Sequence, residues 1–314
     1  MNDTEETPEE TREKTTDTGS VQPTDARIRQ EAAKEMRRIA FGFAVGLLVL
    51  LLLVLVRAPN ALLPDALLPE NQVLPQPPEA PEVPDLPDFS SYEDVNEKKQ
   101  QFFDYLLPVI EHRNAWAREA REFLRLTRER MVEGTALTAE DQQIIVELGE
   151  RYRVKVGESV ELGEIEQLLR RADEIPPSLV LAQAAAESAW GTSRFARMAN
   201  NLFGQWCFTE GCGLVPQRRP AGATHEVKSF DSVLEAVDGY YRNLNSHPAY
   251  EEVRERRARA RAAGRVPEGV DLAAGLERYS ERGQDYIDEI RSIIRFNDLD
   301  ELDTATEVAR LEED

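Results

Sequence analysis

The longest apolar run of the chain is AFGFAVGLLVLLLLVLV, residues 40–56, which has no charged or strongly polar side chain. As an α-helix it would extend about 25 Å, close to the hydrocarbon thickness of a bilayer. The pattern predicts a single transmembrane helix within residues 34–57. A buried core helix and a signal peptide are the alternatives. A signal peptide is disfavoured because nearly 40 residues precede the run and RAPN, without a small-x-small cleavage site, follows it.

Basic side chains are distributed unequally around this run. Lys34, Arg37 and Arg38 lie just before it, whereas only Arg57 follows closely. By the positive-inside rule, the N-terminus is expected in the cytoplasm and everything after Arg57 on the outer side of the inner membrane. The sequence therefore predicts a single-pass protein whose chemistry takes place in the periplasm.

The segments next to the predicted span lack the periodicity of a folded domain. Residues 1–33 are charged and poor in aromatics, which predicts a disordered acidic tail, and residues 300–314 are predicted to be a second acidic tail. Residues 58–89 form a linker in which nine prolines fall within the 29 positions 59–87. Such a composition is typical of a semi-rigid, extended spacer.

Helical periodicity begins after the linker and predicts a helical subdomain at residues 90–174. Ser90 opens the capping-box form SSYE, and Phe102 and Ile110 continue a four-residue apolar spacing towards residue 130. Pro108 is expected to kink or break this helix. TAED at Thr138 predicts a second helix start, and residues 160–172 predict a third helix.

Residues 175–299 are predicted to form a mostly α domain with a small β-hairpin lobe. PPSLVLAQAAAESAW predicts a helix that stops at Gly191. Residues 214–230 have turn chemistry between two segments able to form a hairpin. Apolar spacing then predicts helices over residues 231–247, 251–263 and 272–294.

The charge of the chain excludes some functions. The 314 residues carry a formal net charge of -21, which disfavours nucleic acid as a partner and a uniformly basic membrane-binding face. The chain has no G-x-x-x-x-G-K-[ST], H-E-x-x-H, C-x-x-C or G-x-S-x-G. We therefore expect no nucleotide, metal or other cofactor.

The only cysteines are Cys207 and Cys212, five positions apart in WCFTEGCG. In an oxidising compartment, a disulfide that closes a small loop is the favoured interpretation. Free thiols and zinc are the alternatives. Zinc would need two further ligands, and His225 is the only histidine close in sequence.

Glu187 in AAAESAWGTS is the leading candidate for chemistry. On a helix its neighbours are Gln183, Ala184 and Trp190, with no basic partner three or four residues further on. A carboxyl group held against tryptophan in a desolvated site has a raised pKa and can act as a general acid. Periodicity alone favours a solvated surface residue instead.

The longer stretch AQAAAESAWGTSRFARMANNLFGQWCF resembles the signature of the glucosaminidase superfamily, glycoside hydrolase family 73 and its relatives. With QWCFTEGCGLVP, EVKSFDS, HPAY and LAAGLERYSERGQDYIDEIRSII, residues 92–299 resemble the Bax-type members of that superfamily. The resemblance implies a lysozyme-like, mainly α fold with a small β lobe. It also implies cleavage of the β-1,4 bond after N-acetylglucosamine in peptidoglycan.

The same resemblance suggests the catalytic groups. Glu187 matches the acid of the family, and Glu226 falls where relatives place a second carboxylate on the β lobe, although an outward-facing strand residue is the alternative. The separation of two such carboxylates decides between inversion and retention. Of Tyr240 and Tyr241, we expect Tyr240 at the site, where a phenol could position water or the sugar acetamido group, and the other in the core.

Four further residues are candidates for substrate binding. Trp190, Phe203 and Trp206 could stack on sugar rings, although Phe203 in NNLFG is typical of packing. Asn201 is the fourth candidate, although with Asn200 it is better suited to fixing the loop backbone. His247 before Pro248 is as consistent with a helix-end cap as with acid or base chemistry.

Residues 254–265 form a basic run, RERRARARAAGR, within an acidic protein. A solvated helix face is the simpler interpretation. Contact with peptide-stem carboxylates or with anionic lipid headgroups is the functional alternative.

Together these features predict a membrane-anchored endo-β-N-acetylglucosaminidase whose partners are peptidoglycan glycan strands and the inner membrane. A lytic transglycosylase on the same substrate and a catalytically inactive wall-binding protein are the alternatives. The intact E-S-A-W-G motif disfavours an inactive wall-binding protein.

Overall fold

The computed structural model describes residues 81–217, 219 and 222–304. Within those ranges no helix combines the length and the apolar character needed to cross a membrane. The predicted span at residues 40–56 and the predicted acidic tail at 1–33 lie outside the described residues. The second predicted tail, 300–314, is described only as far as residue 304. There the prediction is wrong: residues 300–304 are helical, and Asp303 is 4% exposed and accepts hydrogen bonds from Ser178 and Gly269.

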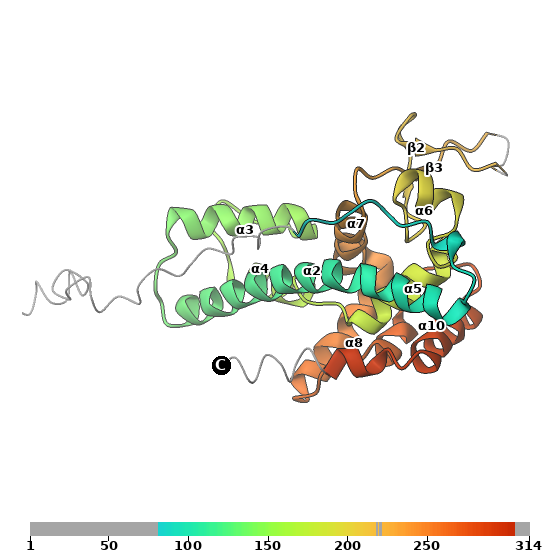
Figure 1. The fold of residues 1–314 in the computed structure, drawn as a ribbon. Coiled ribbons are helices and arrows are strands. Elements are labelled where there is room, and N and C mark those ends of the chain that lie inside the picture. The colour runs from blue at the N-terminus through green and yellow to red at the C-terminus, as the bar shows by residue number, and fades with distance from the viewer. Residues whose placement is uncertain (1–80, 218, 220–221, 305–314) are drawn as a thin grey trace, which may run out of the picture. The chain divides into compact units, whose positions relative to one another are not determined.

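The longest helix of the described chain is α2, Val95–Val132 (Figure 1). Its N-cap is Asp94, whose carboxylate accepts hydrogen bonds from the backbone amides of Asn96 and Glu97. The predicted start at Ser90 is therefore wrong: Ser90 lies in a separate 3-10 turn, η2, Phe89–Ser91, with Asp88 as its cap. The predicted break at Pro108 is also wrong. Pro108 lies on the exposed side of α2, where its missing backbone donor is on the solvent side of the helix.

The helical subdomain consists of the C-terminal half of α2 with α3, Ala139–Tyr152, and α4, Leu162–Arg171. Thr138 begins α3 with the predicted capping box, in which its hydroxyl and the Asp141 carboxylate each accept a backbone amide. The three helices enclose an apolar cluster of their own: Ala120, Phe123, Leu124, Ile145, Leu148, Tyr152, Val154, Ile165, Leu168 and Ala172.

A second, larger core surrounds α5, Pro177–Ser188. Ten of its twelve residues are buried, because α2, α9 and α10 contact it from different sides. The close approach of α9 requires Gly269, since a Cβ there would collide with Ser178 of α5. The remaining helices of this core are α6, Arg194–Ala199, α7, Val233–Ser246, α8, Glu251–Ala262, α9, Gly269–Leu272, and α10, Gln284–Phe296, with the 3-10 turns η3, Pro248–Tyr250, and η4, Ala273–Gly275.

The helix predicted at residues 272–294 is divided in the structure. It comprises the end of α9, the turn η4, an irregular stretch and then α10. Gly283, the N-cap of α10, has φ +52°, a left-handed conformation that interrupts any continuous helix at this point.

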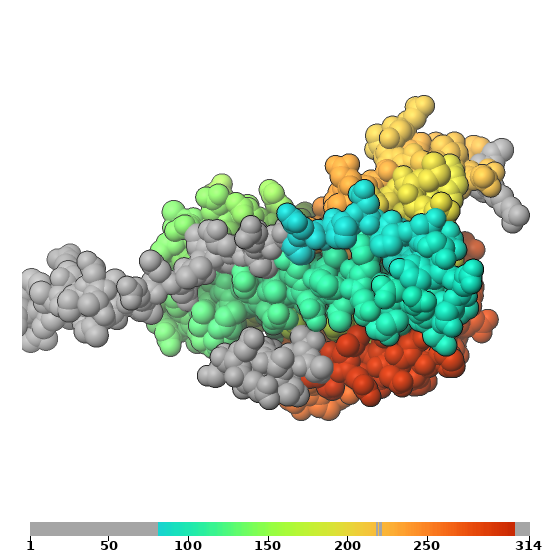
Figure 2. Space-filling view, in the orientation of Figure 1, coloured from blue at the N-terminus to red at the C-terminus, as the bar shows by residue number. Residues whose placement is uncertain are grey.

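The β lobe is a three-stranded antiparallel sheet with strand order β1-β3-β2. Its strands are β1, Trp206–Cys207, β2, Gly213–Leu214, and β3, Glu226–Lys228. The predicted hairpin is present as the β2–β3 pair, and the sequence missed β1, which is only two residues long. In the space-filling view this lobe, in yellow, projects from the helices (Figure 2).

The end of the predicted linker packs on this domain. Val83 and Leu86 lie partly buried against the larger core, and the Phe89 ring is fully buried. The Tyr105 hydroxyl also donates to the Pro84 carbonyl at 2.8 Å.

The basic run at residues 254–265 is a solvated face only in part: the side chains of Arg259 and Arg265 are 59% and 60% exposed, whereas Arg254 and Arg257 are buried. The side chain of Arg257 is 0% exposed and donates to the carbonyl of Glu174, and Arg261 pairs with the buried carboxylate of Asp173 at 2.7 Å. Burial would raise the pKa of Asp173, but the surrounding guanidinium groups outweigh it and hold that pKa below its usual value. Both arginines thus join α8 to the segment between the two cores.

Candidate active site

The chain leaves the helical conformation two residues after Glu187. Helix α5 ends at Ser188, and the next three residues, Ala189, Trp190 and Gly191, all have positive φ. The Ser188 hydroxyl supports this turn, since it donates to the Ala184 carbonyl at 2.6 Å and accepts from the Gly191 amide at 2.8 Å. Glu187 is therefore presented on the last turn of a buried helix.

The carboxyl group of Glu187 is partly buried, and the hydroxyl group of Tyr286 lies near it. Tyr286 of α10 is 3% exposed, and its hydroxyl group interacts with this carboxyl group and lowers the pKa of Glu187. Burial raises the pKa of Glu187 above its ordinary value, and the nearby Glu289 carboxylate acts in the same direction; the Tyr286 hydrogen bond and Arg282 oppose them. A carboxyl group in this environment keeps its proton to a higher pH than an exposed glutamate.

Tyr240 lies behind this carboxyl group rather than on the surface. Its side chain is 1% exposed, and its hydroxyl donates to Gln183 Oε1 at 2.6 Å. Gln183 Nε2 in turn donates to the Tyr286 hydroxyl oxygen at 3.0 Å. Tyr240 thus reaches Glu187 through two intermediate side chains. Tyr241 is equally buried but faces Asn114, to which its hydroxyl donates at 2.8 Å.

The NNLFG turn is the second wall of the site. Gly204 has φ +62°, and a Cβ there would lie 3.2 Å from Glu187 Oε2. Asn201 is 1% exposed and fixes the loop backbone, because its amide nitrogen donates to the carbonyls of Gln205 and Lys228, both at 2.8 Å. Phe203 is 2% exposed and stacks on the Tyr240 ring, with centroids 4.3 Å apart.

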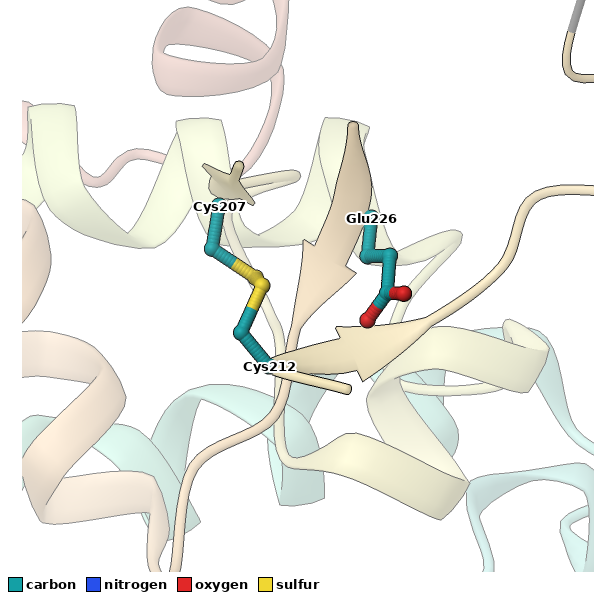
Figure 3. Close-up of side chains that lie close together, drawn as sticks. All are labelled: Cys207, Cys212 and Glu226. Carbon is teal, nitrogen blue, oxygen red and sulfur yellow. A yellow bond between two sulfur atoms is a disulfide. The ribbon is translucent and has the colours of Figure 1, made fainter. Parts of the chain in front are cut away.

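Glu226 lies in the β lobe and is 5% exposed. Its two carboxylate oxygens accept the backbone amides of Gly211 and Gly213 at 3.1 and 2.8 Å. Figure 3 shows this carboxylate beside the disulfide that joins Cys207 to Cys212. The three residues form a cluster of metal-ligand types, but sulfurs bonded to each other offer no thiolate ligands. Within the described part of the chain, no hydrogen bond joins Glu226 to Glu187.

The two tryptophans of the site region have different surroundings. Trp206 is 58% exposed and stacks on His225, with ring centroids 4.3 Å apart. Trp190 packs instead against Phe102 and Phe103 of α2. A broad, exposed aromatic face is thus available at Trp206.

His247 caps the turn that follows α7. Its ring Nδ1 accepts a hydrogen bond from the backbone amide of Ala249 at 3.2 Å. Of the two interpretations of His247, the helix-end cap is therefore the one that the structure shows. Sequence reasoning missed Tyr286 and Gln183 as parts of the site. The signal for Tyr286 was a hydroxyl on the otherwise apolar face that Ile287, Ile290 and Ile294 form on α10.

Comparison with known proteins places part of the chain in a family. Residues 164–299 match the glucosaminidase family model, described as mannosyl-glycoprotein endo-β-N-acetylglucosaminidase. Protein bax of Escherichia coli strain K12 is 35% identical over 195 residues, which are 62% of this chain and 68% of that protein. No solved structure matches the chain.

A mainly helical domain with a small antiparallel sheet that matches a glucosaminidase family model is an enzyme of the glycosidase type with a glycan substrate. More specifically, the chain belongs to the Bax-type glucosaminidase family.

Proposed function

We propose that this protein is an endo-β-N-acetylglucosaminidase that hydrolyses the β-1,4 bond after N-acetylglucosamine in peptidoglycan. The observation that supports it most directly is the Glu187 carboxyl at the end of α5, beside Gly204, where partial burial raises its pKa. In the reaction, the proton of Glu187 passes to the oxygen of the leaving sugar as the glycosidic bond breaks, and water supplies the new hydroxyl group.

Glu226 is the second carboxylate of this proposal, as activator of the water or as nucleophile. Each of its oxygens accepts one amide of the disulfide loop, which leaves a second lone pair on each oxygen for this role. Trp206 is the proposed sugar-stacking surface, because its ring is more than half exposed. Trp190, Phe203 and Asn201 support the turns around Glu187 through the contacts described above.

We further propose that residues 40–56 anchor the protein in the inner membrane and that residues 58–80 hold the domain in the periplasm. The apolar run and the placement of basic residues around it support this orientation. The Cys207–Cys212 disulfide also suits an oxidising compartment.

Digestion of purified peptidoglycan by the wild type and by Glu187→Gln tests the proposal. We expect products with reducing-end N-acetylglucosamine from the wild type, and a loss of at least about 100-fold in Glu187→Gln, since the amide cannot donate a proton as an acid. Anhydro-muramic products in the mass spectra would indicate a lytic transglycosylase. Equal digestion by both proteins would refute Glu187 as the acid.

A further inference from the structure

We propose that Gln183 and Tyr240 are positioning residues for the Glu187 carboxyl group, acting through the Tyr286 hydroxyl. This role rests on the proposed function, because it presumes that Glu187 is the acid. All three supporting side chains are almost fully buried: Gln183 is 0%, Tyr240 1% and Tyr286 3% exposed. A buried polar group must find its partners within the protein, so their directions are tightly constrained.

The hydrogen bonds run in one direction, towards Glu187. Because Tyr240 donates to Gln183 Oε1, the amide nitrogen of Gln183 faces Tyr286 and donates to its oxygen. The oxygen of Tyr286 is thereby occupied as an acceptor, and its hydroxyl proton is left for the Glu187 carboxyl group, with which it interacts. Tyr240 therefore sets the amide orientation of Gln183, and Gln183 sets which partner receives the Tyr286 proton.

A hydrogen-bond chain that ends in a donor facing Glu187 favours the ionised form of its carboxyl group. When the acid gives its proton to the leaving oxygen, a carboxylate forms in a partly buried site, where it needs a donor. The Tyr286 hydroxyl can be that donor, because its oxygen accepts from Gln183 and its proton is left for Glu187. The chain of hydrogen bonds thus stabilises the transition state, in which the proton is leaving, more than the ground state.

Ring packing keeps Tyr240 and Tyr286 in place independently of their hydroxyl groups. Phe203 stacks on Tyr240, and Tyr279 stacks on Tyr286 with centroids 5.5 Å apart. Removing one hydroxyl group should therefore leave the rings where they are. The titratable and charged groups around Glu187 come from α7, η3, α10 and the stretch before α10: Tyr240, Tyr250, Tyr279, Arg282, Tyr286 and Glu289.

The test compares Tyr240→Phe with the matched control Tyr241→Phe in the full-length chain. Both tyrosines lie on α7, are fully buried and donate to a side-chain amide oxygen, Tyr240 to Gln183 at 2.6 Å and Tyr241 to Asn114 at 2.8 Å, with a longer contact of 3.4 Å from Tyr241 to the Ile175 carbonyl. On soluble glycan strands, we expect Tyr240→Phe to lower kcat roughly five- to tenfold, the effect of one hydrogen bond, with KM within about twofold. The alkaline limb of its pH–rate profile should move to higher pH, because the carboxylate has lost support.

Tyr241→Phe should lower the melting temperature to a similar extent while leaving kcat per folded molecule and the pH profile unchanged. Gln183→Leu should reproduce the Tyr240→Phe profile. Identical kinetics for Tyr240→Phe and Tyr241→Phe, or an unmoved limb in both Tyr240→Phe and Gln183→Leu, would refute the inference. Undiminished activity of Glu187→Gln would instead refute the proposed function itself.

Discussion

Substitution of Gly204 tests how strongly activity depends on the position of the Glu187 carboxyl group. Gly204→Ala would place a methyl group 3.2 Å from Glu187 Oε2, nearer than ordinary van der Waals contact, so the carboxyl or the turn must move by a few tenths of an ångström. Its φ of +62° also costs an alanine about 1–2 kcal/mol of folding free energy.

Gly264→Ala separates these two effects. Gly264 has φ +65°, so alanine there carries almost the same backbone strain, but a Cβ meets nothing within 4 Å. Both variants should lose about 1–2 kcal/mol in urea denaturation. Only Gly204→Ala should lower kcat, by roughly 10- to 100-fold, as expected when an acid is displaced from its working geometry. Equal turnover by the two folded variants would contradict the placement of Glu187 beside this turn.

The remaining predictions concern charge. Because a general acid works while protonated, Glu289→Gln, which removes a group that raises the pKa of Glu187, should move the alkaline limb of activity to lower pH, and Arg282→Gln should move it to higher pH. Arg257→Met should lower the free energy of unfolding by about 3–5 kcal/mol in urea titrations, because it leaves Asp173 short of a buried partner. Burial raises the pKa of Asp303 to about 6, above its unfolded value of 3.8, so its contribution to stability is lost as pH rises through this range. Melting temperatures of Asp303→Asn should fall less between pH 4 and 7 than those of the wild type; equal slopes would contradict this assignment.

Much of the helical architecture follows from local sequence signals. The capping box at Thr138 and the apolar spacing after Ser232 predicted α3 and α7 because both signals lie within one or two turns. Glu187 was correctly placed on a helix for the same reason. The start at Ser90 failed because Asp94 offers a competing cap four residues later, and a carboxylate that accepts two amides outcompetes the hydroxyl.

Other features depend on contacts between distant residues, which no short pattern encodes. Strand β1 forms because Cys207 pairs with Glu226, a residue far along the chain. Its two residues are too few to show the alternating pattern that predicts a strand. The basic run at residues 254–265 gave no local sign that Arg257 is buried, because its partners, Asp173 and the Glu174 carbonyl, lie more than 80 positions earlier.

In the site, too, one part could be predicted from local sequence and another depends on contacts between distant residues. The reason is the burial of α5. A helix buried on nearly all sides can present its last turn, but the small residues that permit its burial, such as Ala184 and Ala185, supply no polar support of their own. Support for Glu187 must come from elements that pack on α5, and it does: Tyr286 comes from α10 and Tyr240 from α7. Gln183 is the one polar side chain on α5 that joins them. The motif around Glu187 therefore identifies the acid, whereas the groups that tune it become visible only when the helices are packed together.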